Sequence, residues 1–155
     1  MRITASVDYA VRAVLELAVR PGERVKGEVI AQSQSISFRF VERLLADLRR
    51  AGIVASRRGQ DGGYWLARPA DEITVADVIR AVEGPLADVH GTSPEDVDHP
   101  GPAGVLRELW VATRASLRAV LEEVTFADLA ARELPAELRP LLADDGAWVR
   151  RTRPG

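Results

Sequence analysis

Cysteine is absent from the 155-residue chain. Its absence excludes disulfides, thiolate nucleophiles and iron–sulfur clusters that are held by cysteine. Histidine is also scarce, and no nucleophilic side chain stands beside either of the two histidines. The glycine-bearing stretch 59–63 lies between two expected strands, whereas a phosphate-binding loop stands before a helix. We therefore expect a protein that is not an enzyme.

Long apolar runs are absent as well. No stretch approaches the roughly 18 residues that a membrane-spanning helix needs, and no charged start leads into an apolar signal segment. Apolar residues make up 46% of the chain and charged residues 28%, which is typical of a globular protein. We expect one domain with an arm, located in the cytoplasm and without a membrane partner.

The net charge of −2 hides a strong separation of charge along the chain. Residues 1–68 contain 12 Lys or Arg and 7 Asp or Glu, whereas residues 69–155 contain 9 and 16. A basic half is where an anionic partner such as nucleic acid is expected to bind. The alternative is that these arginines only solvate the faces of an ordinary domain.

Residues 36–69 contain the most informative pattern in the chain. Apolar residues at helical spacing between 40 and 48 predict a helix, and Ala51-Gly52 ends it. Two short apolar runs, 53–54 and 64–66, then flank a basic, glycine-bearing tip and predict a β-hairpin. With a preceding helix over 25–34, this is a winged helix-turn-helix. The expected fold is mainly α with a small β-hairpin, followed by a long dimerisation helix.

The second helix and the hairpin tip supply the candidate DNA-binding residues. Polar side chains opposite the leucines of the helix are free to meet base edges and phosphates, and arginine at the tip suits a narrow minor groove. Lys26 stands at the cap of the preceding helix, where it would place a cation beside a phosphate. The candidates are Lys26, Ser37, Arg39, Phe40, Glu42, Arg43, Arg57, Arg58, Gly59 and Gly62.

This stretch resembles the Rrf2 family of transcriptional regulators. The resemblance rests on Ser37, Phe40-Val41-Glu42, Leu44-Leu45, Leu48, Ala51-Gly52-Ile53-Val54, Ser56, Arg58-Gly59, Gly62-Gly63-Tyr64 and Leu66. It implies that Glu42 reads or rejects a cytosine-bearing base pair and that Arg58 is the minor-groove arginine of the wing. Small residues are commoner in the family where Arg39 stands, which leaves the operator sequence open. Many members sense iron, nitric oxide or redox state through three cysteines, so this chain would be a cysteine-free member without that cluster.

The first nineteen residues predict a buried helix that begins at Ser6 as N-cap. One branch of the family takes cluster ligands from this helix as a glutamate and a histidine four residues apart. Asp8 and Arg12 occupy such a pair here, but arginine has no lone pair to bind a metal, so a helix salt bridge is favoured.

The signal to which the protein responds is the least defined part of the prediction. A capping pair, Thr74 and Asp77, begins another helix, and residues 86–104 read as a loop that contains His90 and His99. Their spacing matches no standard metal motif, and we expect neither a metal nor a cofactor. A small molecule in an apolar pocket near Tyr9, Trp65 and Trp110, or a protein partner, remains open as effector. The candidate effector residues are Asp8, Tyr9, Trp65 and His90.

An apolar seam in residues 105–124 has members spaced 4, 3, 4, 3 and 4 residues apart. Such a seam needs a partner, and the same helix of a second copy gives a homodimer; packing on its own domain is the alternative. The seam residues are Leu106, Trp110, Thr113, Leu117, Val120 and Val124. A short helix follows at 125–129, and then a tail with Trp148 and Arg150-Arg151-Thr152-Arg153 that is either solvated or docked on the dimer or DNA.

Together these patterns divide the chain into a winged domain (1–84), an effector-type loop (85–104), a dimerisation helix with a short following helix (105–132) and a tail (133–155). They predict a homodimeric, sequence-specific regulator of transcription, a repressor, that binds double-stranded DNA at a near-palindromic operator. The alternative is a winged-helix module that binds proteins and no longer binds DNA.

Overall fold

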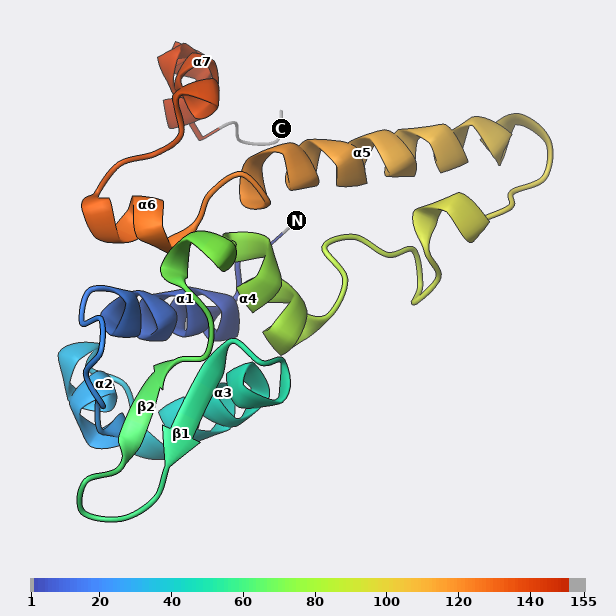
Figure 1. Ribbon diagram of the computed structural model, residues 1–155. Coiled ribbons are helices and arrows are strands. Elements are labelled where there is room, and N and C mark those ends of the chain that lie inside the picture. The colour runs from blue at the N-terminus through green and yellow to red at the C-terminus, as the bar shows by residue number, and fades with distance from the viewer. Residues whose placement is uncertain (1, 151–155) are drawn as a thin grey trace.

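The computed structural model describes residues 2–150 and consists of a helical body with a projecting arm (Figure 1). The body contains the first four helices, the hairpin and α6, and the arm is α5. Behind α6 the chain forms a separate small helix, α7. The elements are α1 (Ala5–Ala18), α2 (Gly27–Ser33), α3 (Phe38–Arg50), β1 (Val54–Arg57), β2 (Gly63–Leu66), α4 (Val75–Glu83), α5 (Leu106–Leu121), α6 (Phe126–Ala131) and α7 (Arg139–Ala143).

The first helix lies in the centre of the body, and its apolar stripe is buried as expected. Val7, Ala10, Val14 and Leu17 are each less than 9% exposed. The expected N-cap at Ser6 is wrong: the Thr4 hydroxyl accepts the hydrogen bond from the Val7 N–H, and Ser6 lies inside the helix.

Helices α2 and α3 form the helix-turn-helix. Lys26 is the N-cap of α2 and makes no side-chain capping bond, as its cationic side chain predicts. Ile30 and Ala31 of α2 are buried, whereas Val29 beside them is 43% exposed. Between the helices the chain turns through Ser35, whose φ is 54°.

The hairpin is a two-stranded antiparallel sheet in which Val54 pairs with Leu66 and Arg57 pairs with Gly63. Val25 extends it by exchanging two backbone hydrogen bonds with Tyr64, of 2.9 and 2.8 Å. At the tip, a Cβ on Gly62 would lie 2.1 Å from the Arg57 carbonyl oxygen. Only glycine fits this approach, so the tight turn of the wing depends on it.

Helix α6 returns to the body after the arm. Phe126 is fully buried in the core that α1, α3 and the hairpin form, and its N–H donates to the Ile73 carbonyl at 2.9 Å. The predicted capping pair before α4, Thr74 with Asp77, is confirmed as a complete capping box, and Thr125 with Asp128 forms a second one before α6. The winged domain therefore uses α6 as well as residues 1–84.

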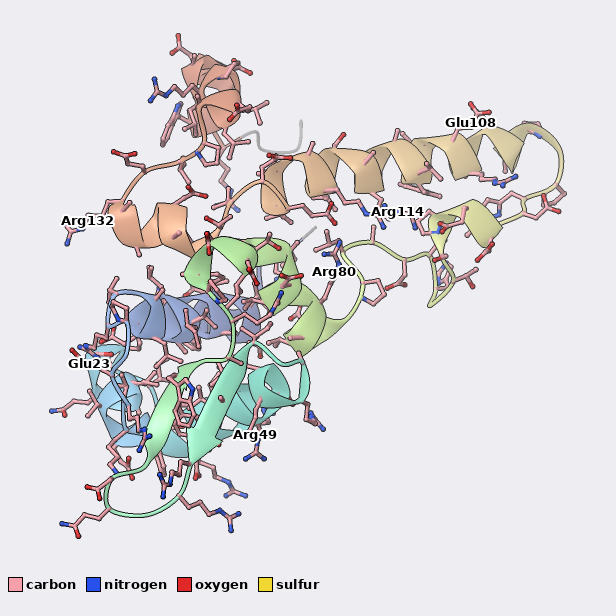
Figure 2. All side chains as sticks on the ribbon, viewed as in Figure 1. Glu23, Arg49, Arg80, Glu108, Arg114 and Arg132 are labelled. Carbon is pink, nitrogen blue, oxygen red and sulfur yellow. The ribbon has the colours of Figure 1, made fainter. Side chains whose placement is uncertain are left out.

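Residues 86–104 run beside the arm (Figure 1) and contain two 3₁₀ turns, Pro94–Asp96 and Gly101–Val105. Pro94 and Val97 are buried, and Glu95 forms an ion pair of 2.6 Å with Arg114 of α5. Figure 2 shows Arg114 directed toward this segment. Backbone hydrogen bonding of Glu95 and the bond from Arg114 hold the pKa of Glu95 below its usual range. The segment is thus irregular, as predicted, but fastened to α5.

None of the helices among residues 2–150 combines the length and the apolar character that a crossing of the bilayer requires. Beyond α6 the described part of the tail forms a 3₁₀ turn (Ala136–Leu138), α7 and a further turn (Asp145–Trp148). Leu138 is buried, whereas Trp148 is 73% exposed and its indole N–H donates to the Leu142 carbonyl at 2.8 Å. The expected basic contacts of residues 151–153 lie outside the described residues.

Candidate nucleic-acid interface

Helix α3 divides into a buried and an exposed face. Its buried side consists of Val41, Leu44, Leu45 and Leu48, each at most 1% exposed. The sequence candidates Ser37, Arg39, Glu42 and Arg43 are all exposed, as their spacing predicts. Ser37 is also the N-cap, because its hydroxyl accepts the Phe40 N–H at 3.4 Å. The polar tips of α3 are therefore available to a ligand at its first two turns.

Phe40 has a different place from the other candidates. It is half-buried, with the Tyr9 ring of α1 packed edge-on at 5.8 Å between centroids. The Arg43 guanidinium lies over the Phe40 ring, 4.8 Å from its centroid, and the Arg12 guanidinium lies 5.5 Å from the Tyr9 centroid. Such cation–π contacts orient a guanidinium. Phe40 and Tyr9 thus support Arg43 on the exposed face.

The wing tip is held by two cations that come from the segment before α2. The Lys26 ammonium donates to the carbonyl oxygens of Gly59 (3.0 Å) and Gln60 (2.7 Å), and the Arg24 guanidinium donates to that of Asp61 at 3.1 Å. Lys26 was expected beside a phosphate, and here it ties α2 to the hairpin. No local pattern points to Arg24 in this role, because the contact joins residues that are 37 positions apart.

A groove of about 400 Å³ lies between α3 and the hairpin. Of the predicted interface, it brings together Lys26, Glu42, Arg57, Arg58, Gly59 and Gly62. Ser37, Arg39, Phe40 and Arg43 line a second hollow at the start of α3. Arg49 also lines the groove and lies beside the hairpin (Figure 2), with its guanidinium 3.3 Å from the Ser56 hydroxyl. Sequence reasoning missed it, although Arg49 follows Glu42 by two helical turns.

The candidate effector residues do not share one site. Asp8 forms the predicted salt bridge with Arg12, at 2.8 Å. Trp65 lines a cavity at the end of α1 that neither Tyr9 nor Trp110 lines. His90 is exposed and has a φ of 54°, in a turn closed by two hydrogen bonds between Val89 and Thr92.

The seam of α5 is open along most of its length. Within the described chain no residue of α5 is fully buried: Leu106, Trp110, Leu117 and Val120 are half-buried and Thr113 is exposed. Arg114 and the segment 86–104 occupy the neighbouring flank. Val124 was assigned to the seam wrongly, because α5 ends at Leu121 and Val124 is buried in the body at 6% exposure.

Comparison with known proteins identifies the family. A family model described as "Rrf2: Iron-dependent Transcriptional regulator" matches residues 3–132. The chain belongs to the Rrf2 family of transcriptional regulators. The prediction from residues 37–66 is therefore confirmed, as are the winged-helix fold and the assignment to transcription regulation and DNA binding.

Relatives of this Rrf2 protein cover nearly all of its length. The HTH-type transcriptional regulator Rv1287 of Mycobacterium tuberculosis is 44% identical over 100% of this chain and 96% of its own length. CymR of Bacillus subtilis is 38% identical over 84% of this chain and 90% of its own. The structure of CymR, the global cysteine regulator of B. subtilis, superposes with a TM-score of 0.72 at 34% identity, covering 85% of this chain and 98% of CymR. The structure of T. potens IscR gives a TM-score of 0.68 at 34% identity, over 85% and 88% of the two chains.

The family description names iron, and the residues of this Rrf2 protein do not fit an iron or iron–sulfur group. The sequence has no cysteine. Across residues 2–150, no three His, Asp or Glu side chains come together in a way that would hold a metal ion. The described residues therefore offer no ligand set for iron.

Proposed function

We propose that this Rrf2 protein is a homodimeric, sequence-specific repressor that binds a near-palindromic operator. One observation supports this above the others. The exposed cations of α3 and of the hairpin meet along one groove, while the apolar seam lies on the projecting α5 and is at most half-buried among the described residues. The cationic groove suits the phosphate backbone of a DNA duplex. The apolar seam of α5 suits the same helix of a second copy of the chain.

On DNA, the first two turns of α3 enter the major groove, and the wing follows the backbone into the adjacent minor groove. Arg39 and Arg43 meet phosphates or guanine edges, while Glu42 accepts a hydrogen bond from a cytosine amine. Arg58, exposed at the wing tip, takes the minor groove, where the negative potential is strongest. Arg49 joins this set because it lines the same groove.

Dimerisation sets the spacing of the operator. Two α5 helices that pair through Leu106, Trp110, Thr113, Leu117 and Val120 relate the two bodies by a two-fold axis. The two copies of α3 then read half-sites about one helical turn apart, roughly 34 Å along the DNA.

The test is a charge-removal series on the DNA upstream of the protein's own gene. Arg43→Ala combined with Arg58→Ala removes one cation from α3 and one from the wing. Fluorescence anisotropy across a range of salt concentrations measures the slope of log affinity against log salt. Each lost phosphate contact reduces this slope by about 0.9, so the double variant loses roughly 1.8 per protomer.

The matched control is Arg107→Ala combined with Arg139→Ala, which removes the same charge from exposed positions in α5 and α7. Both elements lie away from the hairpin (Figure 1). We expect the control to keep the parent slope and affinity. An unchanged slope in the Arg43 and Arg58 double variant would refute the assignment of the interface.

A further inference from the structure

A cavity of about 500 Å³ lies on the far side of the hairpin from the DNA-binding groove. It is enclosed by the end of α1, the turn over residues 20–24 and the base of the wing. Successive residues of a strand point to opposite faces, so Tyr64 of β2 faces the groove and Trp65 faces the cavity. The two sites therefore share one strand of the wing.

The walls of this cavity combine apolar surface with positive charge. Leu17, Ala18 and Trp65 are among its apolar lining residues, and Arg20, Arg24 and Arg68 are its cationic ones. Glu23 is the one carboxylate among its lining residues. Small-molecule sites are typically apolar with a few polar groups that fix orientation, and their volumes run from about 300 to 1,000 Å³. The cavity is within this range.

Two of these arginines, Arg20 and Arg24, have guanidinium donors without an acceptor in the described chain. Arg20 pairs with Glu16 at 2.6 Å through one nitrogen, while its other terminal nitrogen is buried without a hydrogen-bond partner among the described residues. A buried donor that stays unpaired costs free energy. Arg24 lies 5.4 Å from the centre of the Trp65 ring, with only the Asp61 carbonyl as acceptor in the described chain.

We propose that this cavity binds a small organic anion with a flat apolar body, in the class of aromatic carboxylates, and that its binding weakens the hold on DNA. The carboxylate accepts hydrogen bonds from the guanidinium groups, which suit it in geometry and charge. The ring packs on the apolar surface of Trp65, near the Arg24 guanidinium, which lies 5.4 Å from the centre of the Trp65 ring.

The effect on DNA rests on the proposed function and acts through Arg24. Its guanidinium reaches from the Trp65 ring to the Asp61 carbonyl in the wing tip. A carboxylate in the cavity competes with that carbonyl for the same donors. Of the side-chain hydrogen bonds to the tip in the described chain, the two from Lys26 then remain, so the wing is less well ordered for its contact with the minor groove.

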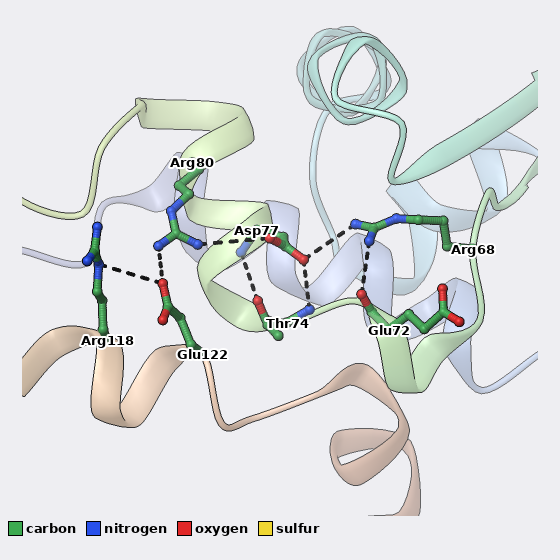
Figure 3. Close-up of polar contacts among 7 residues, drawn as sticks. All are labelled: Arg68, Glu72, Thr74, Asp77, Arg80, Arg118 and Glu122. Atoms are coloured by element: carbon green, nitrogen blue, oxygen red, sulfur yellow. Dashed lines mark hydrogen bonds and ion pairs between the residues drawn. The ribbon is translucent and has the colours of Figure 1, made fainter. Parts of the chain in front are cut away.

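A second connection runs from Arg68 to the arm (Figure 3). Arg68 donates to the Glu72 carbonyl at 3.0 Å and lies 3.4 Å from Asp77, which lies 3.9 Å from Arg80. Arg80 pairs in turn with Glu122, next to the end of α5. These ion pairs are largely solvent-exposed, and such pairs contribute little individually. The connection through Arg24 and the wing is therefore the principal one.

The binding test uses ¹H–¹⁵N NMR of the full chain with 1-naphthoate as probe. The three tryptophans, Trp65, Trp110 and Trp148, give three indole N–H signals, which single Trp→Phe variants assign. We expect 1-naphthoate to shift the Trp65 signal in a saturable manner and to leave the other two in place. The uncharged analogue 1-naphthamide should bind at least about ten-fold more weakly, because it lacks the charge-assisted hydrogen bonds.

Arg24→Gln should weaken 1-naphthoate binding by about ten-fold or more, whereas Arg139→Gln, in the exposed α7, should not change it. The unfolding temperature of both variants reports whether each is folded. No shift at Trp65, an equal response to the amide, or an equal affinity of the Arg24 variant overturns the site.

DNA binding is measured in a separate experiment, so that failure of the ligand site can be distinguished from failure of the proposed DNA-binding function. Saturating 1-naphthoate should weaken operator binding several-fold in the parent protein and not in the Arg24→Gln variant. Since coupling is reciprocal, operator DNA should weaken 1-naphthoate binding by the same factor. A shifted Trp65 signal with unchanged DNA affinity refutes the coupling. If 1-naphthoate shifts the Trp65 signal but the protein does not bind DNA, the proposed function is refuted while the ligand-binding site still stands.

Discussion

Replacing Lys26 by methionine separates two roles that a cation near DNA can have. The side chain keeps its length but loses both hydrogen bonds to the wing tip, at 3.0 and 2.7 Å. A hydrogen bond from a charged donor contributes about 1.5 to 3 kcal/mol when it is shielded, and exposure lowers that value. Both bonds are solvent-exposed. We take about 1 kcal/mol for the pair, which is the free energy by which Lys26 orders the wing.

The lost free energy of ordering appears as weaker DNA binding, because a loosened wing must become ordered when it binds. A loss of about 1 kcal/mol weakens the affinity about five-fold for one wing. A dimer places two wings on one operator, so its affinity falls roughly 25-fold. The slope of log affinity against log salt should stay as in the parent protein, since a wing anchor neutralises no phosphate. Fluorescence anisotropy of labelled operator DNA over a series of salt concentrations measures both quantities.

A phosphate contact by Lys26 would give a different result in the same experiment. If Lys26 contacts a phosphate, Lys26→Met reduces the salt slope by about 0.9 per protomer. Such a reduction would refute the role as a wing anchor. Arg139→Met is the control, since it removes an exposed charge in α7 and should alter neither affinity nor slope.

Three further changes test the body, the cap of α6 and the arm. Phe126→Ala removes a fully buried ring and should lower the free energy of unfolding in urea by about 3 to 5 kcal/mol, whereas Leu134→Ala, at a residue 43% exposed, should cost less than about 1 kcal/mol; equal effects would contradict the place of Phe126 in the core. Hydrogen bonds from Thr125 hold the pKa of Asp128 below its usual range, so its stabilising contribution is present above pH about 4 and is lost as the pH falls further; Asp128→Asn should flatten that part of the stability profile in thermal unfolding, and an unaltered profile would count against the capping box. Leu117→Arg places a charge in the middle of the α5 seam and should shift the protein from dimer to monomer in analytical ultracentrifugation without unfolding it; a dimer as stable as the parent would exclude the seam as the interface.

The parts of the fold that sequence predicted are those that local patterns determine. The leucines of α3 repeat at helical spacing, and the two capping boxes each lie within four consecutive residues. The hairpin is marked by a basic tip whose glycines the turn requires. The exposed face of α3 follows directly from the buried one, so most candidate DNA-binding residues lie where the spacing placed them.

The errors concern positions where a local pattern permits two answers. Thr4 and Ser6 are both good N-caps, and only the packing of α1 selects Thr4. The seam spacing continues smoothly to Val124, although the helix ends at Leu121 and the chain turns into the body. Spacing alone does not show where a helix stops. The anchors of the wing, Lys26 and Arg24, join residues more than thirty apart and have no local signal.

The segment 86–104 of this Rrf2 protein is held in place by contacts with the arm. Two buried side chains, Pro94 and Val97, and the ion pair between Glu95 and Arg114 fasten it to α5. Its order therefore comes from packing and needs no metal ligand. In the proposed regulation, a ligand acts at the wing, where a small loss of order weakens the contact with DNA. Its tip depends on a few solvent-exposed hydrogen bonds, and one of their donors, Arg24, already faces a cavity of ligand size.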